Sequence, residues 1–269
     1  MFYSGRIIDN LLISDKHYLM KVSTPFIQPF IPGQFVMIRA WQGTDPLLPR
    51  PFAIYSWEVV GGQNVLQIVY KIVGRGTVIL SGLHRGDEVQ INGPLGNGFL
   101  EPEGAEKFIL AGGGIGFSSV FPVALHLKGL GKEMKIILGA RTDKDIPPAS
   151  SVGAKSIEGD VTYTTEDGSM GFRGLVTEVL EKKIEDIGIA SREKWAVFAC
   201  GPAEMLNTVK ALSAEKKIRA FLSLENFMAC GFGVCLGCVV KVAAPDGYQH
   251  VRVCKEGPVF SSDEVIFGD

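Results

Sequence analysis

The feature that most constrains this chain is a group of cysteines near its C-terminal end. Four of the five cysteines follow the pattern C-x4-C-x2-C with a fourth further along: Cys230, Cys235, Cys238 and Cys254. This is the spacing of plant-type [2Fe–2S] ligation, in which thiolates hold the cluster. Glycines between the cysteines let a tight loop bend and point N–H groups at the sulfurs. The spacing therefore predicts a [2Fe–2S] site, with the last cysteine reached by a strand over residues 249–254.

A structural zinc site and a set of unlinked free thiols are the alternatives. Zinc sites usually combine two close cysteine pairs, and only one C-x2-C pair occurs here. The spacing favours iron over zinc, but both alternatives stay open at this point.

The composition is that of an ordinary globular protein, and it excludes some classes of binding partner. The 269 residues are 46% hydrophobic and 21% charged, with a formal net charge of −2 and no basic block. Nucleic acid and anionic membranes are therefore not expected as partners. Residues 108–127 lack Asp, Glu, Lys and Arg, but their glycine run and Pro122 favour a buried strand–turn–helix over a membrane span. Without a signal-peptide pattern at Met1, and with clustered cysteines, we expect a cytoplasmic protein.

The first third of the chain reads as short strands separated by turns. Apolar, alternating runs predict strands over residues 33–39, 51–57, 65–73 and 87–91, with a short helix over 77–83. Closely spaced short strands are typical of an antiparallel barrel or sandwich.

After Gly98 the pattern changes to alternating strands and helices, which is typical of a parallel sheet. Predicted strands cover residues 108–111, 134–140, 160–165, 195–199 and 219–224, and predicted helices follow the glycine run to 128 and cover 174–183 and 202–216. The segment 143–155 is expected to be a loop. The fold class is therefore β plus α/β: a barrel, a parallel-sheet domain and a small C-terminal module.

Two glycine-rich turns in the α/β part are candidate nucleotide sites. Gly112, Gly113, Gly114 and Gly116 follow a strand and open a helix, so backbone N–H groups there could face a diphosphate. Cys200, Gly201 and Pro202 end another strand, at the edge where parallel sheets bind ligands. Close strand–helix packing would demand the same glycines, and Cys200 is equally well explained as a small packing residue.

Two motifs in the first domain could clamp a phosphate. Arg50 begins a strand, and Gly76 with Thr77 opens the short helix. A solvated arginine and an ordinary turn are the alternatives. The four histidines show no ligand spacing, so no catalytic acid or base is predicted.

Taken together, these motifs resemble the ferredoxin–NADP reductase superfamily and, within it, the electron-transfer subunits of the two-subunit, NAD-linked dihydroorotate dehydrogenases. The resemblance runs over nearly the whole chain. It rests on residues 50–53 (Arg-Pro-Phe-Ala), 70–77, 93–99, 112–116, 200–202, 224–230 and 254–260.

The resemblance implies an FAD-binding β-barrel over residues 1–101, an NAD-binding α/β domain over 102–220 and a [2Fe–2S] module over 221–269. It assigns the FAD diphosphate to Arg50, Gly76 and Thr77, and the flavin ring to Pro51, Phe52, Ala53, Val69, Tyr70 and Lys71. It assigns the nicotinamide nucleotide to Gly112, Gly113, Gly114, Gly116, Cys200, Gly201 and Pro202. The family usually has Ser or Thr at the position of Ala53, so a hydroxyl near the flavin is missing here.

The resemblance also implies a role. Such a chain would pass electrons between NAD and an FMN-containing catalytic subunit, in a heterotetramer that serves pyrimidine biosynthesis. The closest alternative is the reductase subunit of another NAD(P)H-dependent complex, of ferredoxin:NADP reductase, sulfide dehydrogenase or hydrogenase type. A nucleotide-binding regulatory module with structural zinc is a further alternative. The resemblance favours NAD over NADP.

Overall fold

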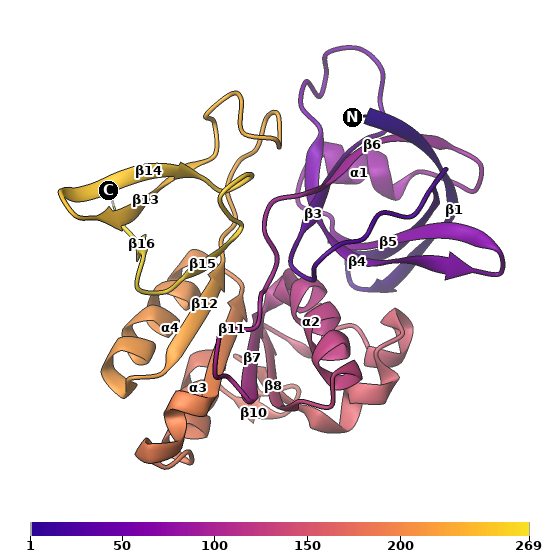
Figure 1. Ribbon diagram of the computed structural model, residues 1–269. Coiled ribbons are helices and arrows are strands. Elements are labelled where there is room, and N and C mark those ends of the chain that lie inside the picture. The colour runs from indigo at the N-terminus through magenta and orange to yellow at the C-terminus, as the bar shows by residue number, and fades with distance from the viewer. Residues whose placement is uncertain (1, 269) are drawn as a thin grey trace.

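The structure, a computed structural model that describes residues 2–268, contains a β-barrel, a sheet covered by helices and a small C-terminal sheet (Figure 1). Six antiparallel strands close the barrel in the order β1-β2-β5-β4-β3-β6. They are β1 (Phe2–Ser14), β2 (His17–Ser23), β3 (Phe35–Arg39), β4 (Arg50–Val60), β5 (Gln63–Lys71) and β6 (Glu88–Leu95).

Apolar residues at every second strand position fill the barrel, because successive side chains point to opposite faces. Met20 and Val22 of β2 and Ile54 of β4 are fully buried there. The helix α1 (Arg75–Ser81) adds Leu80 to the same core. The barrel core is therefore its own hydrophobic unit, separate from the two cores of the sheet.

The second part is a seven-stranded sheet in the order β10-β9-β8-β7-β11-β12-β15, parallel except for its last strand. Its strands from the α/β segment are β7 (Lys107–Gly113), β8 (Glu133–Ala140), β9 (Val161–Thr165), β10 (Phe172–Arg173), β11 (Trp195–Cys200) and β12 (Arg219–Ser223). The helices are α2 (Phe117–Gly129), α3 (Val176–Glu185) and α4 (Ala203–Lys216). Short 3-10 turns are η1 (Gly114–Gly116), η2 (Asp143–Asp145), η3 (Ala149–Val152), η4 (Lys155–Asp160) and η5 (Ile189–Lys194).

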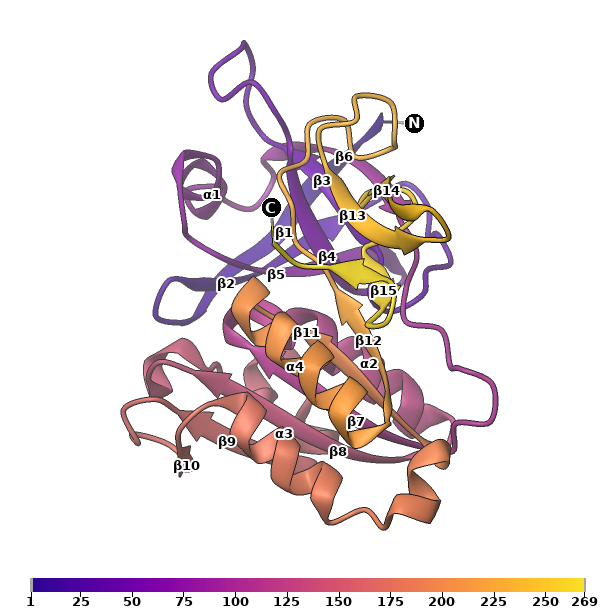
Figure 2. The same cartoon turned by 90° about the vertical axis from the view of Figure 1, so that its left-hand side faces the viewer.

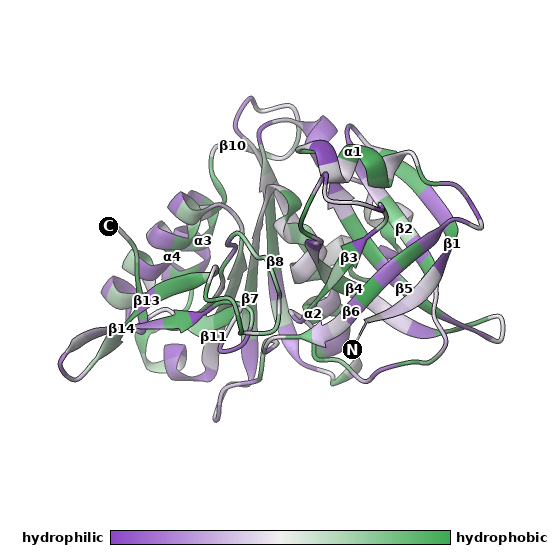
Figure 3. Ribbon diagram, turned by 90° about the horizontal axis from the view of Figure 1, so that it is seen from above, coloured by the Kyte–Doolittle hydropathy of each residue, from purple (hydrophilic) through white to green (hydrophobic). Residues whose placement is uncertain are grey.

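Helices cover both faces of this sheet, which explains its nearly continuous apolar strands. Figures 1 and 2 show α2 on the face toward the barrel and α3 with α4 on the other. Along β7, Phe108 and Leu110 pack with α2, while Ile109 and Ala111 pack with α3 and α4. In Figure 3 the central strands are mostly apolar, and polar residues lie along α3 and α4.

The C-terminal residues form a three-stranded sheet, and one strand within this segment joins the large sheet instead. The small sheet has the order β14-β13-β16, formed by β13 (Val239–Ala244), β14 (Gly247–Arg252) and β16 (Val265–Ile266). Between them, β15 (Val259–Ser261) pairs antiparallel with β12 at the edge of the large sheet. The C-terminal segment is thereby fixed to the α/β domain by backbone hydrogen bonds.

The expected fold class is confirmed, with one local correction. The strand predicted to run through Cys254 ends at Arg252, because the carbonyl of Arg252 accepts the N–H of Glu256 at 2.9 Å and closes a turn. The domain limits at residues 101 and 220 stay predictions. Among residues 2–268, no helix is long and apolar enough to cross a membrane.

Candidate functional site

A cavity of about 570 Å³ lies between the barrel and the carboxyl ends of the sheet strands. Barrel strands β3, β4 and β5 form one wall, and the start of α2 with the end of β11 forms the other. Volumes of roughly 300–1,000 Å³ are typical of small-molecule and cofactor sites. Its lining residues include eight of the predicted flavin residues and one predicted nicotinamide residue: Arg50, Pro51, Phe52, Ala53, Val69, Tyr70, Lys71, Thr77 and Cys200.

Arg50 and Gly76 are brought together as the sequence predicts. A Cβ on Gly76 would lie 2.8 Å from Nε of Arg50, so only glycine lets the guanidinium lie this close to the start of α1. The same guanidinium lies 5.5 Å from the centre of the Trp41 ring and donates to the carbonyl of Leu48. Arg50 is therefore held at the cavity by contacts with its own domain.

Thr77 lies in the same corner, but its hydroxyl already has partners. It accepts the N–H groups of Val73 at 3.0 Å and Gly74 at 3.1 Å, and donates to the carbonyl of Gly74 at 2.8 Å. Its visible role is to shape the turn that opens α1.

Two of the predicted flavin residues on the cavity lining also contact other parts of the protein. The Tyr70 ring is buried in the barrel core and its hydroxyl donates to Oδ1 of Asn10 at 3.0 Å. The Lys71 ammonium forms an ion pair with Asp145 of η2 at 2.6 Å. Lys71 therefore links the barrel to the α/β domain at the edge of the cavity.

The glycine loop and the Cys200–Pro202 turn pack directly on each other. A Cβ on Gly116 would lie 2.1 Å from the carbonyl oxygen of Cys200, and one on Gly113 would lie 2.5 Å from Sδ of Met205. Gly112 is similarly confined by Leu138, whereas Gly114 has φ +54° and open space where a side chain would be. Packing alone thus explains three of the four predicted glycines, and Gly114 is the one left free to approach a ligand.

Cys200 presents a neutral thiol to the cavity. Burial and the nearby Glu225 raise the pKa of this thiol to about 12, although hydrogen bonds with the Ser119 and Ser223 hydroxyls oppose the shift. The Glu225 carboxyl itself lies on the cavity wall, where burial among protein atoms raises its pKa. This end of the cavity holds small polar groups and one carboxyl.

Sequence reasoning missed part of the lining. The cavity is completed by Gly33, Phe35, Val73, Ile115, Ser118, Ser119, Ser223, Leu224, Glu225, Asn226, Phe227, Met228 and Pro258. The segment Leu224–Met228 was visible as part of a motif, but nothing in its composition placed it beside the barrel. The segment directly follows β12, so it starts at the carboxyl edge of the sheet, where the barrel lies.

The four clustered cysteines form two pairs. The N–H of Cys254 donates to Sγ of Cys238 at 3.4 Å, and the N–H and side chain of Cys235 lie beside the Cys230 thiol, where their hydrogen bonds lower its pKa. Among the described residues, no three metal-binding side chains gather around one point. Two pairs fit a [2Fe–2S] cluster, whose two irons share four cysteines between them.

The loop backbone is shaped to hold thiolates. Gly231 and Gly233 have φ values of +80° and +87°, the left-handed region that favours glycine. Burial raises the pKa of Cys230, but N–H groups of Cys235, Phe232 and Val234 outweigh it and bring that pKa to about 6. The thiolate-stabilising N–H groups are the feature expected of an iron–sulfur loop.

Comparison with known proteins agrees with this arrangement. Residues 225–266 match the model of the iron-sulfur cluster binding domain of dihydroorotate dehydrogenase B. The dihydroorotate dehydrogenase B (NAD(+)) electron transfer subunit of Caldanaerobacter subterraneus subsp. tengcongensis is 36% identical over 265 residues, 98% of each chain. The corresponding subunit of Desulforamulus reducens is 33% identical over 266 residues, again 98% of each chain.

Solved structures show the same fold. A chain of the NADH-dependent reduced ferredoxin-NADP oxidoreductase, a protein of flavin-based electron bifurcation, superposes with a TM-score of 0.82 at 28% identity, covering 97% of this chain and 89% of that one. Phthalate dioxygenase reductase superposes with a TM-score of 0.65 at 16% identity, covering 94% of this chain and 77% of that one. At that identity the second match supports the fold alone.

Proposed function

The chain belongs to the family of dihydroorotate dehydrogenase B electron transfer subunits, and we propose that it carries electrons between NAD and a separate catalytic subunit by way of FAD and a [2Fe–2S] cluster. One observation carries the proposal: the cavity that would hold the flavin is lined by Met228 and Pro258, which flank the segments that bear the cluster cysteines. A bound flavin supplies the exchange between two-electron hydride chemistry and one-electron transfer to iron–sulfur.

The chain itself keeps the two sites close. Met228 lines the cavity and stands two residues before Cys230, a distance of at most ~7 Å for extended backbone. On the other side, Pro258 lines the cavity four residues after Cys254. A Cβ on Gly231 would lie 2.4 Å from Cγ of Met37, so the cluster loop also packs tightly on the barrel.

The predicted ligand residues are part of this proposal. Arg50 and the start of α1 would hold the FAD diphosphate, and the β4 and β5 wall would take the ring. The open Gly114 and the Cys200–Pro202 turn would meet the nicotinamide nucleotide. The four paired cysteines would ligate the cluster. Ala53 has no hydroxyl to offer on the flavin wall, and the hydroxyls of Ser118, Ser119 and Ser223 lie on the opposite side of the cavity.

We assign the partner surface to the cluster loop. Phe232, Val234 and Leu236 are 47%, 73% and 60% exposed, and Figure 1 shows this loop projecting from the C-terminal sheet. Several exposed apolar side chains on one loop are typical of an interaction site. The partner would be an FMN-containing dihydroorotate dehydrogenase catalytic subunit, joined in a heterotetramer in the cytoplasm, where the thiols stay reduced.

A second candidate function is that of a reductase subunit in a ferredoxin-NADP oxidoreductase complex, because the chain superposes on one chain of such a protein. Co-expression separates the two. With an FMN-type catalytic subunit, we expect a complex of two copies of each chain that converts dihydroorotate to orotate with NAD. A chain that is reduced by NADH, does not bind that subunit and instead reduces ferredoxin would favour the second candidate.

A further inference from the structure

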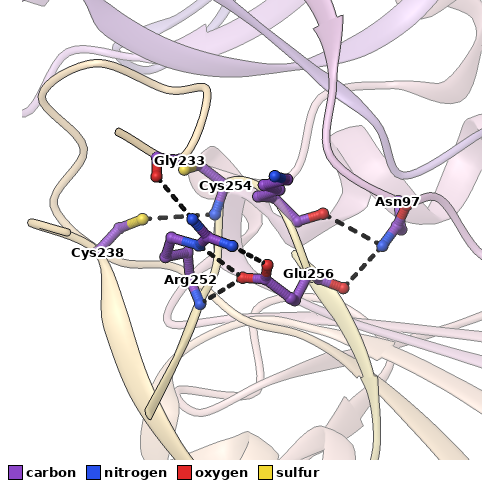
Figure 4. Close-up of polar contacts among 7 residues, drawn as sticks. Asn97, Gly233, Cys238, Arg252, Cys254 and Glu256 are labelled. Carbon is purple, nitrogen blue, oxygen red and sulfur yellow. Dashed lines mark hydrogen bonds and ion pairs between the residues drawn. The ribbon is translucent and has the colours of Figure 1, made fainter. Parts of the chain in front are cut away.

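Arg252 closes the turn that carries Cys254. Its carbonyl accepts the N–H groups of Lys255 at 3.1 Å and Glu256 at 2.9 Å. Its own N–H and its Nε donate to Oε2 of Glu256 at 2.8 and 3.0 Å, and its Nη2 donates to Oε1. Cys254 thus lies in a turn whose two ends, Arg252 and Glu256, are joined by backbone and side-chain hydrogen bonds (Figure 4).

The same guanidinium reaches the loop that carries the other cysteines. Nη1 of Arg252 donates to the carbonyl of Gly233 at 2.8 Å. Gly233 stands between Cys230 and Cys235, so one planar side chain spans the two segments that bear the thiols. Arg252 and Glu256 side chains are only 27% and 34% exposed, which shields the interaction from solvent more than at an open surface pair.

Asn97, in the segment that follows β6, attaches this turn to the barrel. Its Nδ2 donates to the carbonyl of Glu256 at 2.8 Å and that of Lys255 at 3.3 Å. Its N–H donates to the carbonyl of Gly257 at 2.6 Å. Figure 4 shows the chain of contacts from Gly233 through Arg252 and Glu256 to Asn97.

We propose that Arg252 is a positioning residue that fixes the spacing between the Cys230–Cys235 pair and the Cys238–Cys254 pair, with Glu256 neutralising its charge beside the cluster. This inference rests on the proposed function, because it requires the cysteines to hold iron. The fork geometry of arginine matters, since lysine cannot bond a carboxylate and a carbonyl in the same plane.

Four variants separate geometry from charge: Arg252→Gln, Arg252→Lys, Glu256→Gln and the double variant Arg252→Gln/Glu256→Gln. Arg6→Gln is the matched control, because it breaks a 2.8 Å ion pair with Glu88 whose side chains are 70% and 61% exposed. Retained flavin absorbance shows that each variant is folded. The readouts are the cluster's EPR spectrum, its midpoint potential and the rate of iron release to a chelator under anaerobic conditions.

The two roles predict different patterns. Arg252→Gln leaves Glu256 uncompensated and lowers the potential, Glu256→Gln raises it, and the double variant returns toward wild type. Arg252→Gln and Arg252→Lys both alter the EPR spectrum and release iron faster by about tenfold or more, the scale of one lost charge-assisted hydrogen bond.

Three results would overturn the inference. If both Arg252 variants release iron at the rate of Arg6→Gln and give the same EPR spectrum, the positioning role is rejected and the proposed function stays intact. Potentials that shift in the same direction in Arg252→Gln and Glu256→Gln would reject the charge pairing. Wild-type protein that binds no iron would reject the proposed function, and this inference with it.

Discussion

Replacing Gly116 by alanine sets helix propensity against packing at the glycine loop. Gly116 has φ −56° and ψ −18°, which alanine adopts freely, so helix propensity alone predicts a gain of up to ~1 kcal/mol. However, the new Cβ would lie 2.1 Å from the carbonyl oxygen of Cys200 and 2.7 Å from its carbonyl carbon, whereas ordinary contact begins at 3.4 Å. Both are backbone atoms of β11, so no side-chain rotation relieves the clash.

We expect packing to win. Overpacking costs about 1–3 kcal/mol and sometimes more. With rigid backbone this close, we take the upper end, so the net loss after the propensity gain is about 2 kcal/mol, which lowers Tm by about 4–8 °C in a chain of this size. The control is Gly129→Ala at the other end of α2, where no atom lies within 4 Å and we expect an unchanged or slightly higher Tm. Thermal unfolding of the FAD-loaded proteins, followed by circular dichroism, measures both. A Gly116→Ala protein that melts with wild type would refute the packing account of this loop.

Three further predictions concern the domain contact, the thiols and the partner surface. Lys71→Met removes the 2.6 Å ion pair with Asp145, whose side chains are 30% and 21% exposed, and should cost no more than about 1 kcal/mol by denaturant unfolding. In iron-free protein, iodoacetamide should label Cys230 at pH 7, and the labelling should slow as the pH falls through the Cys230 pKa of about 6, because only the thiolate reacts. Cys200 has a pKa of about 12 and should stay unlabelled; mass spectrometry measures both. Val234→Asp should weaken binding to the catalytic subunit by about tenfold or more in calorimetry, with iron and flavin content unchanged.

The sequence predicted the elements well because local patterns determine them. The change from closely spaced strands to alternating strands and helices near Gly98 corresponds to the end of the barrel and the start of the sheet. The cysteine spacing also identified the cluster loop without reference to the rest of the fold.

What the sequence could not supply depends on contacts between distant segments. Lys71 lines the cavity as predicted, but its ion pair with Asp145 was hidden, because Asp145 is brought close only when the barrel docks on the α/β domain. The sequence also could not show that Gly116 packs against the backbone of Cys200, which is far along the chain. The strand predicted through Cys254 ended early because Arg252 bonds Glu256, a local contact that alternating valines do not reveal.

The most direct test of the central claim is metal and spectral analysis of the protein purified without oxygen, before and after addition of NADH. The account predicts two irons and two sulfides per chain with one FAD. It also predicts that NADH bleaches the flavin band and that the reduced cluster gives an EPR signal. Zinc in place of iron, or a flavin that NADH reduces in a protein without iron and sulfide, would contradict it.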